Sequence, residues 1–199
     1  MTVAGRHYYR CPGCMATFLS PGQRPDATTE KAVYDDHRNE IHDPGYRRFL
    51  GKLASGLIPL LPPGARGMDF GCGPGPALVA MLQESGFDAV GYDPWYYPDQ
   101  GLLSETYDFI TCTEVVEHLH DPAGTFRLLD ECLKHGGWLG VMTCFQTDDA
   151  RFAAWHYRRD PTHVVFYREA TMRVLAARFG WECRIPRKDV ALFRKTGAA

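Results

Sequence analysis

Apolar and polar residues follow each other along this chain with a spacing that changes from segment to segment. In residues 46–61 the apolar positions recur every three or four residues, which predicts a helix ended by Pro62-Pro63-Gly64. Beyond that point, short runs rich in β-branched and aromatic residues predict strands, separated by stretches with helical spacing. The predicted strands are 66–70, 89–92, 107–113, 138–143, 181–185 and 190–194. The predicted helices are 77–85, 121–134 (stopped by Gly136-Gly137) and 169–179.

Strands that alternate with helices predict a mostly parallel α/β sheet with helices on both of its faces. The last two predicted strands are joined by four residues, so they form a hairpin that adds an antiparallel strand. The irregular stretch 95–103 leaves room for a short further strand. Residues 1–43 are polar and turn-rich with little periodicity, so we expect an N-terminal segment distinct from a main domain at 44–199.

Composition narrows the classes of protein that this chain can represent. Of its 199 residues 45% are apolar and 23% are charged, which is typical of soluble globular proteins. Its apolar runs are too short for a membrane helix, and its N-terminus has no apolar secretion signal. A net charge of −2 gives no broad positive field for nucleic acid. Seven scattered cysteines favour reduced thiols and a cytoplasmic protein.

The most informative run is MDFGCGPG, residues 68–75. Its three alternating glycines lie between a predicted strand and a predicted helix, where free backbone N–H groups and the helix dipole favour a nucleotide-like ligand. The run lacks the GxxxxGK[ST] of a phosphate-binding loop, and Ala77 and Leu78 break the dinucleotide pattern GxGxxG. Asp93 follows the next strand, 24 positions after Asp69, close to the spacing expected of a ribose-binding acid.

This run resembles motif I, (D/E)xGxGxG, of the class I S-adenosylmethionine (SAM)-dependent methyltransferases, and the resemblance covers about residues 44–196. It implies a Rossmann-like, seven-stranded, mostly parallel sheet whose C-terminal hairpin strand is antiparallel. It also implies that the glycine loop wraps the methionine end of SAM, while the acid after the next strand binds the ribose. The implied cofactor residues are Asp69, Phe70, Gly71, Cys72, Gly73, Gly75, Asp93, Pro94, Thr113 and Glu114.

Two polar clusters downstream are the candidates for catalysis. TEVVEH (residues 113–118) contains Glu117 and His118, and DPTH (residues 160–163) contains His163. A histidine titrates near neutral pH, so His163 is the candidate general base for a hydroxyl or amine acceptor. In many methyltransferases an EHL-like triplet holds the active-site loop without metal, which is one interpretation of Glu117 and His118.

A second interpretation of the same residues is a metal site. The spacing ExxEH is similar to that of the ubiquinone-biosynthesis O-methyltransferases and the small-RNA 2′-O-methyltransferases. That similarity implies Mg²⁺ or Mn²⁺ bound by Glu114, Glu117, His118 and His163, which would lower the pKa of an acceptor hydroxyl.

The N-terminal segment contains a CxxC pair, Cys11 and Cys14, which resembles half of a zinc ribbon. Zinc needs two further ligands, and His37 and His42 are the candidates within the same segment. A metal-free remnant and a redox-active dithiol are the alternatives.

The sequence therefore predicts a SAM-dependent methyltransferase that acts on a small molecule, with O-methylation as the expected reaction and His163 as the candidate base. The alternatives are a catalytically silent SAM- or nucleotide-binding module and a metal-dependent O-methyltransferase acting on RNA. A nicotinamide-dependent oxidoreductase is disfavoured by the glycine spacing and the terminal hairpin. The methyl acceptor, its acceptor atom and the oligomeric state are left open.

Overall fold

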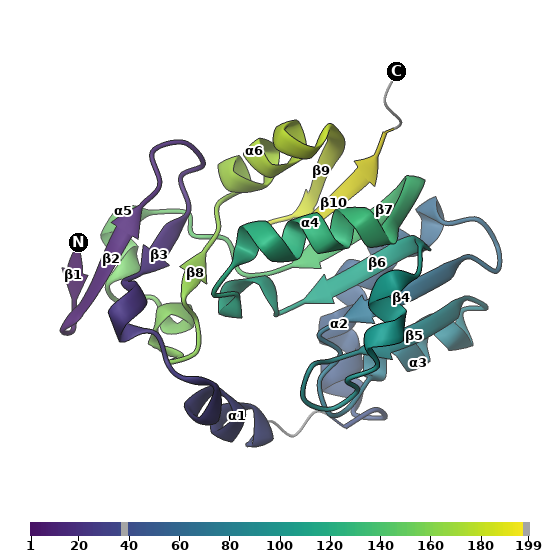
Figure 1. Ribbon diagram of the computed structural model, residues 1–199, viewed down its shortest axis with the longest axis horizontal. Helices are drawn as coiled ribbons and strands as arrows, with labels where there is room; N and C mark the ends of the chain where they lie inside the picture. Colours follow the sequence, from purple (N-terminus) through teal and green to yellow (C-terminus); the bar gives the residue numbers. More distant parts are fainter. Residues whose placement is uncertain (37–39, 197–199) are drawn as a thin grey trace.

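A six-stranded sheet forms the centre of the protein (Figure 1). The computed structural model describes residues 1–36 and 40–196. Four strands of this sheet are parallel and adjacent, and the C-terminal hairpin completes it, with β10 antiparallel to both of its neighbours. In sheet order the strands are β5 (Asp88–Tyr92), β4 (Arg66–Phe70), β6 (Tyr107–Thr113), β7 (Leu133–Met142), β10 (Val190–Lys195) and β9 (Trp181–Arg187).

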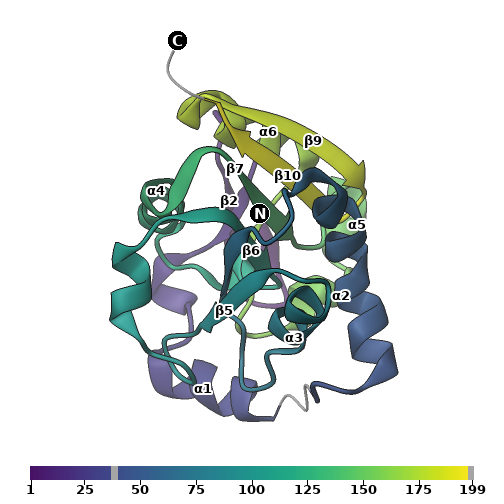
Figure 2. The same ribbon diagram turned by 90° about the vertical axis from the view of Figure 1, so that its right-hand side faces the viewer.

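Helices cover both faces of the sheet because alternate side chains of each strand point to opposite sides (Figure 2). One face packs on α2 (Pro44–Leu57) and α3 (Ala77–Glu84) through a core cluster that includes Phe109 of β6. The other face packs on α4 (Pro122–Cys132) and α6 (Glu169–Phe179), and its cluster includes Ile110 of β6. The remaining helical turns are η1 (Pro21–Gln23), η2 (Ile58–Leu60), η3 (Gln100–Ser104), η4 (Val116–His118), α5 (Asp149–Phe152) and η5 (His156–Arg159).

The predicted fold class is confirmed, and two details of the prediction were wrong. Within the described residues the sheet has six strands instead of seven, because the stretch 95–103 contains the short 3-10 helix η3 and no sheet strand. The side chain of Asp99 caps that turn by accepting a hydrogen bond from the N–H of Gly101. Gly136-Gly137 does not stop α4 but lies inside β7, which begins at Leu133, a buried residue paired with Tyr107.

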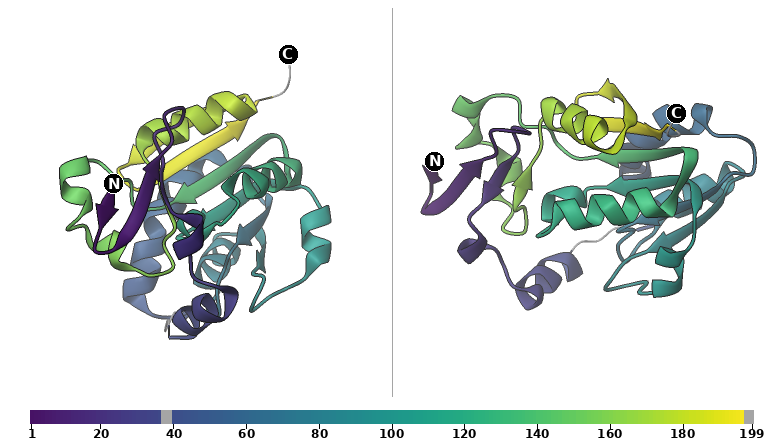
Figure 3. Two further views of the ribbon diagram at one scale, coloured as in Figure 1. Left: turned by 60° about the vertical axis from the view of Figure 1, so that its left-hand side comes forward. Right: turned by 45° about the horizontal axis from the view of Figure 1, so that its top comes forward.

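The N-terminal segment has more regular structure than its sequence pattern predicts. Strands β1 (Thr2–Val3), β2 (Arg6–Arg10) and β3 (Thr17–Leu19) join β8 (Val165–Phe166) in a second sheet (Figure 3). The register of β3 on β8 pairs residues nearly 150 positions apart, such as Thr17 with Phe166, so local periodicity cannot reveal it. Helix α1 (Ala27–Asp35) follows. Across residues 1–36 and 40–196, no helix is long and apolar enough to span a membrane.

Candidate active site

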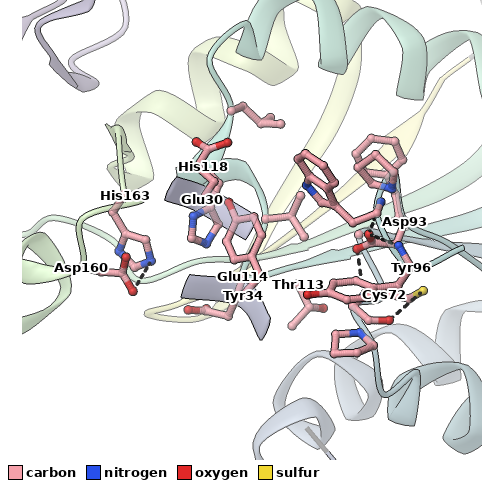
Figure 4. A pocket seen from close by; sticks show the side chains of 18 of the residues that line it. Glu30, Tyr34, Cys72, Asp93, Tyr96, Thr113, Glu114, His118, Asp160 and His163 are labelled. Atoms are coloured by element: carbon pink, nitrogen blue, oxygen red, sulfur yellow. Dashed lines mark hydrogen bonds and ion pairs between the residues drawn. The ribbon is translucent and has the colours of Figure 1, made fainter. Parts of the chain in front are cut away.

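A cavity of about 590 Å³ opens at the carboxyl ends of the central parallel strands. Its walls come from the loops that follow β4, β5 and β6, from α1 and α2, and from the segment of residues 156–163. Figure 4 shows two ends of this cavity, with Asp93, Tyr96 and Cys72 at one and His163, Asp160 and His118 at the other. Ligands of open α/β sheets bind at this edge, where the strands end.

The glycine loop forms one wall of the cavity and requires glycine at a specific position. Gly71 and Gly73 have φ angles of +78° and +64°, in the left-handed region that residues with a Cβ rarely adopt. A Cβ on Gly71 would also overlap Cγ2 of Val115, a residue of the loop after β6. The N–H of Gly71 donates to the carbonyl of Tyr92 at 2.7 Å, which ties this loop to the end of β5.

Asp93 joins the loops that follow β4 and β5 at one end of the cavity. The residue is buried, and its carboxylate accepts hydrogen bonds from the backbone N–H groups of Gly73 (3.1 Å), Trp95 (2.8 Å) and Tyr96 (3.1 Å). These contacts fix the direction of the carboxylate toward the glycine loop. An acid held in that position can accept further hydrogen bonds from ligand hydroxyls, since each carboxylate offers about four lone-pair sites.

Most of the residues predicted to bind cofactor line this cavity. They are Phe70, Gly71, Cys72, Gly73, Asp93, Pro94, Thr113 and Glu114. Asp69 and Gly75 do not line it. Asp69 lies in the interior of the sheet, where its Oδ1 accepts a hydrogen bond from Thr111 Oγ1 at 2.6 Å and burial raises its pKa to about 7. Its role in the fold is therefore to link β4 to β6 rather than to contact a ligand directly.

His118 and His163 lie at the other end of the cavity, with ring centroids 4.7 Å apart. Nδ1 of His163 lies 2.7 Å from the backbone oxygen of Tyr157, and Nδ1 of His118 lies 3.2 Å from that of Thr162. Because a carbonyl can only accept, each neutral ring carries its proton on Nδ1, and Nε2 is the basic nitrogen. Asp160 Oδ2 lies 3.8 Å from Nε2 of His163.

The carboxyl groups of Glu114 and Glu117 both contact the hydroxyl of Tyr157. Tyr157 Oη donates to Glu114 Oε2 at 3.1 Å and to Oε1 of Glu117, and it also contacts Thr143 Oγ1 at 3.0 Å. Burial raises the pKa of Glu114 to about 7 and that of Glu117 well above its ordinary value. Glu114 has a φ of +53°, a strained conformation for a residue with a side chain and one that is typical of functional sites.

The structure brings together part of the predicted metal set. One ligand atom each of Glu117, His118 and His163 lie within 4.8 Å of one another, and Glu114 is not a member of this group. Oε2 of Glu117 is buried and has no hydrogen-bond partner among the described residues. One carboxylate oxygen and two imidazole nitrogens are donors that suit a divalent cation.

The predicted zinc set is not assembled in the described part of the chain. Cys11 and Cys14 lie in the turn between β2 and β3, and the N–H of Met15 donates to the carbonyl of Cys11 at 2.8 Å. His42 is exposed and forms no three-residue group with the two thiols, because it precedes α2 rather than packing on this turn. His37 lies outside the described residues.

Sequence reasoning missed several residues of the cavity. Glu30 and Tyr34 come from α1, where their i,i+4 spacing puts both on one helical face. Tyr157 was part of a segment expected to contact substrate, but its link to both glutamates was not predicted. For Tyr157 the local signal was the density of aromatic and polar side chains in residues 156–163. For Glu30 and Tyr34 the sequence of α1 gives no signal that the helix lies beside the cavity.

The parallel sheet with its antiparallel hairpin strand, together with a cavity lined by a GxG loop and by an acid after the next strand, matches the arrangement that the resemblance to class I SAM-dependent methyltransferases implied. A family model described as a methyltransferase domain matches residues 38–184. The chain therefore belongs to this methyltransferase-domain family.

Known proteins similar to this chain include enzymes that use SAM. The chain is 32% identical over 103 residues to the ubiquinone biosynthesis O-methyltransferase of Bordetella pertussis. That match covers 40% of this chain and 43% of the relative, so the chain spans less than half the length of the curated protein it matches.

Solved structures resemble this one over more of its length. The Burkholderia thailandensis 1,6-didemethyltoxoflavin-N1-methyltransferase, with bound 1,6-didemethyltoxoflavin and S-adenosylhomocysteine, has a TM-score of 0.61 at 14% identity and covers 96% of this chain and 99% of its own. A SAM-dependent methyltransferase from Archaeoglobus fulgidus has a TM-score of 0.54 at 21% identity, with 68% of this chain and 69% of its own covered. At these identities the likeness shows the fold.

Proposed function

We propose that this chain transfers the methyl group of SAM to a hydroxyl of a small-molecule acceptor. The observation that carries the proposal is one continuous cavity with Asp93 and the glycine loop at one end and His163 at the other. The relative that acts in ubiquinone biosynthesis is named as an O-methyltransferase, which supports oxygen as the acceptor atom.

In this proposal the cofactor end holds SAM through residues that line the cavity. The glycine loop allows the methionine part to approach the backbone, and the Asp93 carboxylate accepts hydrogen bonds from the ribose hydroxyls. The residues assigned to this end are Phe70, Gly71, Cys72, Gly73, Asp93, Pro94, Thr113 and Glu114. Asp69 and Gly75 do not line the cavity, and the proposal gives them no contact with SAM.

His163 acts as the general base at the acceptor end. SAM supplies an activated methyl group, so the protein has to align the acceptor and remove one proton. Nε2 of His163 accepts the hydroxyl proton, while its Nδ1–H donates to the carbonyl of Tyr157 and stabilises the ring orientation. The carboxylate of Asp160, 3.8 Å from Nε2, stabilises the imidazolium that forms. His118, bonded to Thr162, and Glu117, bonded to Tyr157, position the loops around the base.

The test compares His163→Gln with His135→Gln, an exposed histidine of β7. Purified variants are incubated with SAM and a library of hydroxylated small molecules, and S-adenosylhomocysteine formation is measured for any acceptor found. His163→Gln is expected to lower kcat by about 10²- to 10⁴-fold without changing the Kd for SAM, whereas His135→Gln retains both. Unchanged kcat in His163→Gln would exclude this histidine as the base.

A second candidate function, metal-assisted methyl transfer, is supported by the buried, partnerless Oε2 of Glu117. Glu117, His118 and His163 would hold Mg²⁺ or Mn²⁺, and each histidine Nδ1 bonded to a carbonyl matches the outer contacts usual for metal-binding imidazoles. A bound cation would lower the pKa of an acceptor hydroxyl, so that the hydroxyl proton could pass to water while His163 serves as a ligand. An RNA acceptor is not supported, since no Lys or Arg among the described residues lines the cavity.

Metal analysis of the purified protein distinguishes these two mechanisms. The metal-assisted mechanism predicts stoichiometric Mn²⁺ binding that Glu117→Gln abolishes and that Glu131→Gln, on the exposed face of α4, leaves intact. Absence of Mn²⁺ binding by the wild-type protein supports the metal-free mechanism.

We also infer that residues 1–43 form an accessory segment of a methyltransferase domain at 44–199. The support is that α1 contributes Glu30 and Tyr34 to the cavity, while β3 pairs with β8 two positions after His163. The segment thereby lines part of the cavity through α1 and is joined through β3 to the strand that follows His163.

A further inference from the structure

The acceptor end of the cavity has an unbalanced set of charges. Among the described residues this end includes the carboxylates of Glu30 and Asp160, and no lysine or arginine of that part of the chain lines the cavity. Figure 4 shows Glu30 and Asp160 beside His118 and His163. An acceptor that enters this end therefore meets carboxylates without a neighbouring permanent cation.

Asp160 is held at this end of the cavity by two hydrogen bonds. Its Oδ1 accepts from the N–H (2.8 Å) and the hydroxyl (2.6 Å) of Thr162. The side chain of Glu30 is less exposed than that of Asp160, 14% against 27%, and its carboxylate pairs with His120 Nε2 at 2.9 Å. Donated hydrogen bonds favour the charged form of a carboxyl group, so Asp160 brings a negative charge to the acceptor end.

Aromatic rings form the other walls of this end. The ring of Tyr34 lies edge-on to that of His118, with centroids 5.3 Å apart, and the ring of Tyr157 lies 4.2 Å from that of His163. Ring faces and edges bind planar molecules, and the faces also attract cations. The walls therefore suit a flat, unsaturated acceptor.

We propose that the acceptor is a neutral or cationic hydroxylated aromatic molecule, and that this cavity rejects acceptors with a carboxylate or phosphate beside the ring. The proposal rests on the proposed function, because it concerns the molecule that receives the methyl group at that site. An anionic group would be desolvated next to Asp160 and Glu30 with no lysine or arginine of the described lining to pair it, and like charges disfavour such binding.

The experiment measures binding of three catechol compounds of similar size and different charge to protein saturated with S-adenosylhomocysteine. The rings bear an aminomethyl, a hydroxymethyl or a carboxylate group, so they differ mainly in charge, and Kd is measured by calorimetry at millimolar ligand. We expect the carboxylate compound to bind at least about tenfold more weakly than the hydroxymethyl compound, and the aminomethyl compound to bind at least as tightly.

Two aspartate variants connect that selectivity to the structure. Asp160→Asn keeps an oxygen that can accept the hydrogen bonds of Thr162 but removes the charge. The tenfold difference in Kd between the carboxylate and hydroxymethyl compounds, hereafter the gap, should therefore shrink at least about threefold. Asp148→Asn is the matched control, since Asp148 makes the same kind of hydrogen bond, to the N–H of Ala150 at 2.8 Å, and does not line this cavity. It should leave the gap unchanged.

The proposal is overturned if the carboxylate compound binds as tightly as the hydroxymethyl compound, if neither uncharged nor cationic compound binds, or if Asp160→Asn keeps the full gap. A separate titration with S-adenosylhomocysteine distinguishes failure of the proposed function. Protein that does not bind S-adenosylhomocysteine contradicts the methyltransferase assignment of the site. Protein that binds it and prefers the carboxylate compound contradicts the charge inference alone.

Discussion

The buried carboxyl of Asp69 makes the stability of this protein depend on pH. Burial in the sheet raises its pKa from 3.8 to about 7, although Thr111 donates a hydrogen bond to it at 2.6 Å. Between these two pH values the folded protein keeps a proton that the unfolded chain has lost. The free energy of unfolding therefore falls as the pH rises through this window. The shift in pKa corresponds to a total change of about 4 kcal/mol in the free energy of unfolding across this window.

Asp69→Asn removes this dependence without removing the link between the strands. An asparagine side chain does not ionise, and its amide oxygen can still accept the hydrogen bond from Thr111 Oγ1. Relative to the wild-type protein, the variant is expected to gain up to about 4 kcal/mol as the pH is raised from about 4 to about 8. Glu114 and Glu117 titrate in both proteins, so their contributions to the pH dependence cancel in the difference between the two unfolding free energies.

Urea denaturation at a series of pH values measures this gain. Asp88→Asn is the control, since Asp88 is an exposed residue of β5 whose ion pair with Arg66, at 3.6 Å, contributes little. Its unfolding free energy should follow the wild-type pH profile. If Asp69→Asn shows the same pH profile as the wild-type protein, Asp69 is not protonated in the fold and the reasoning from burial is wrong.

Two further predictions concern the glycine loop and the CxxC turn. Gly71→Ala is expected to destabilise the fold by about 1–3 kcal/mol and to weaken SAM binding, because its Cβ would overlap Val115. Gly73→Ala is the control: Gly73 has a similar φ but no atom near its Cβ position, so this variant should lose less stability. Equal unfolding free energies for the two variants would contradict the overlap. If the CxxC turn holds zinc, the zinc content of the purified protein falls in Cys11→Ser and not in Cys183→Ser. A zinc content that is the same in Cys11→Ser and in the wild-type protein excludes a site at Cys11.

The features predicted correctly from the sequence are those determined by short-range pattern. Strand Arg66–Phe70, the glycines that follow it and Asp93 after β5 lie within one strand–helix–strand unit, so spacing alone brings them to one edge. His163, the candidate base of the DPTH cluster, also lines the cavity.

The features that the sequence did not reveal depend on contacts between distant segments. The pairing of β3 with β8 joins the N-terminal hairpin to the loop that carries His163, and no periodicity within residues 1–43 indicates it. Glu30 and Tyr34 reach the cavity only because α1 packs beside it. The predicted use of His42 assumed that closeness in sequence implied closeness to the CxxC turn, which the fold does not provide.

In the proposed function SAM binds between the glycine loop and Asp93, and calorimetric titration with S-adenosylhomocysteine tests this binding most directly. We expect the wild-type protein to bind, and Asp93→Ala to bind at least about tenfold more weakly. Asp99→Ala is the control, because Asp99 also caps a backbone N–H nearby but does not line the cavity, and it should bind as the wild-type protein does. A wild-type protein that does not bind S-adenosylhomocysteine, or an Asp93→Ala variant that binds it equally well, would contradict this account.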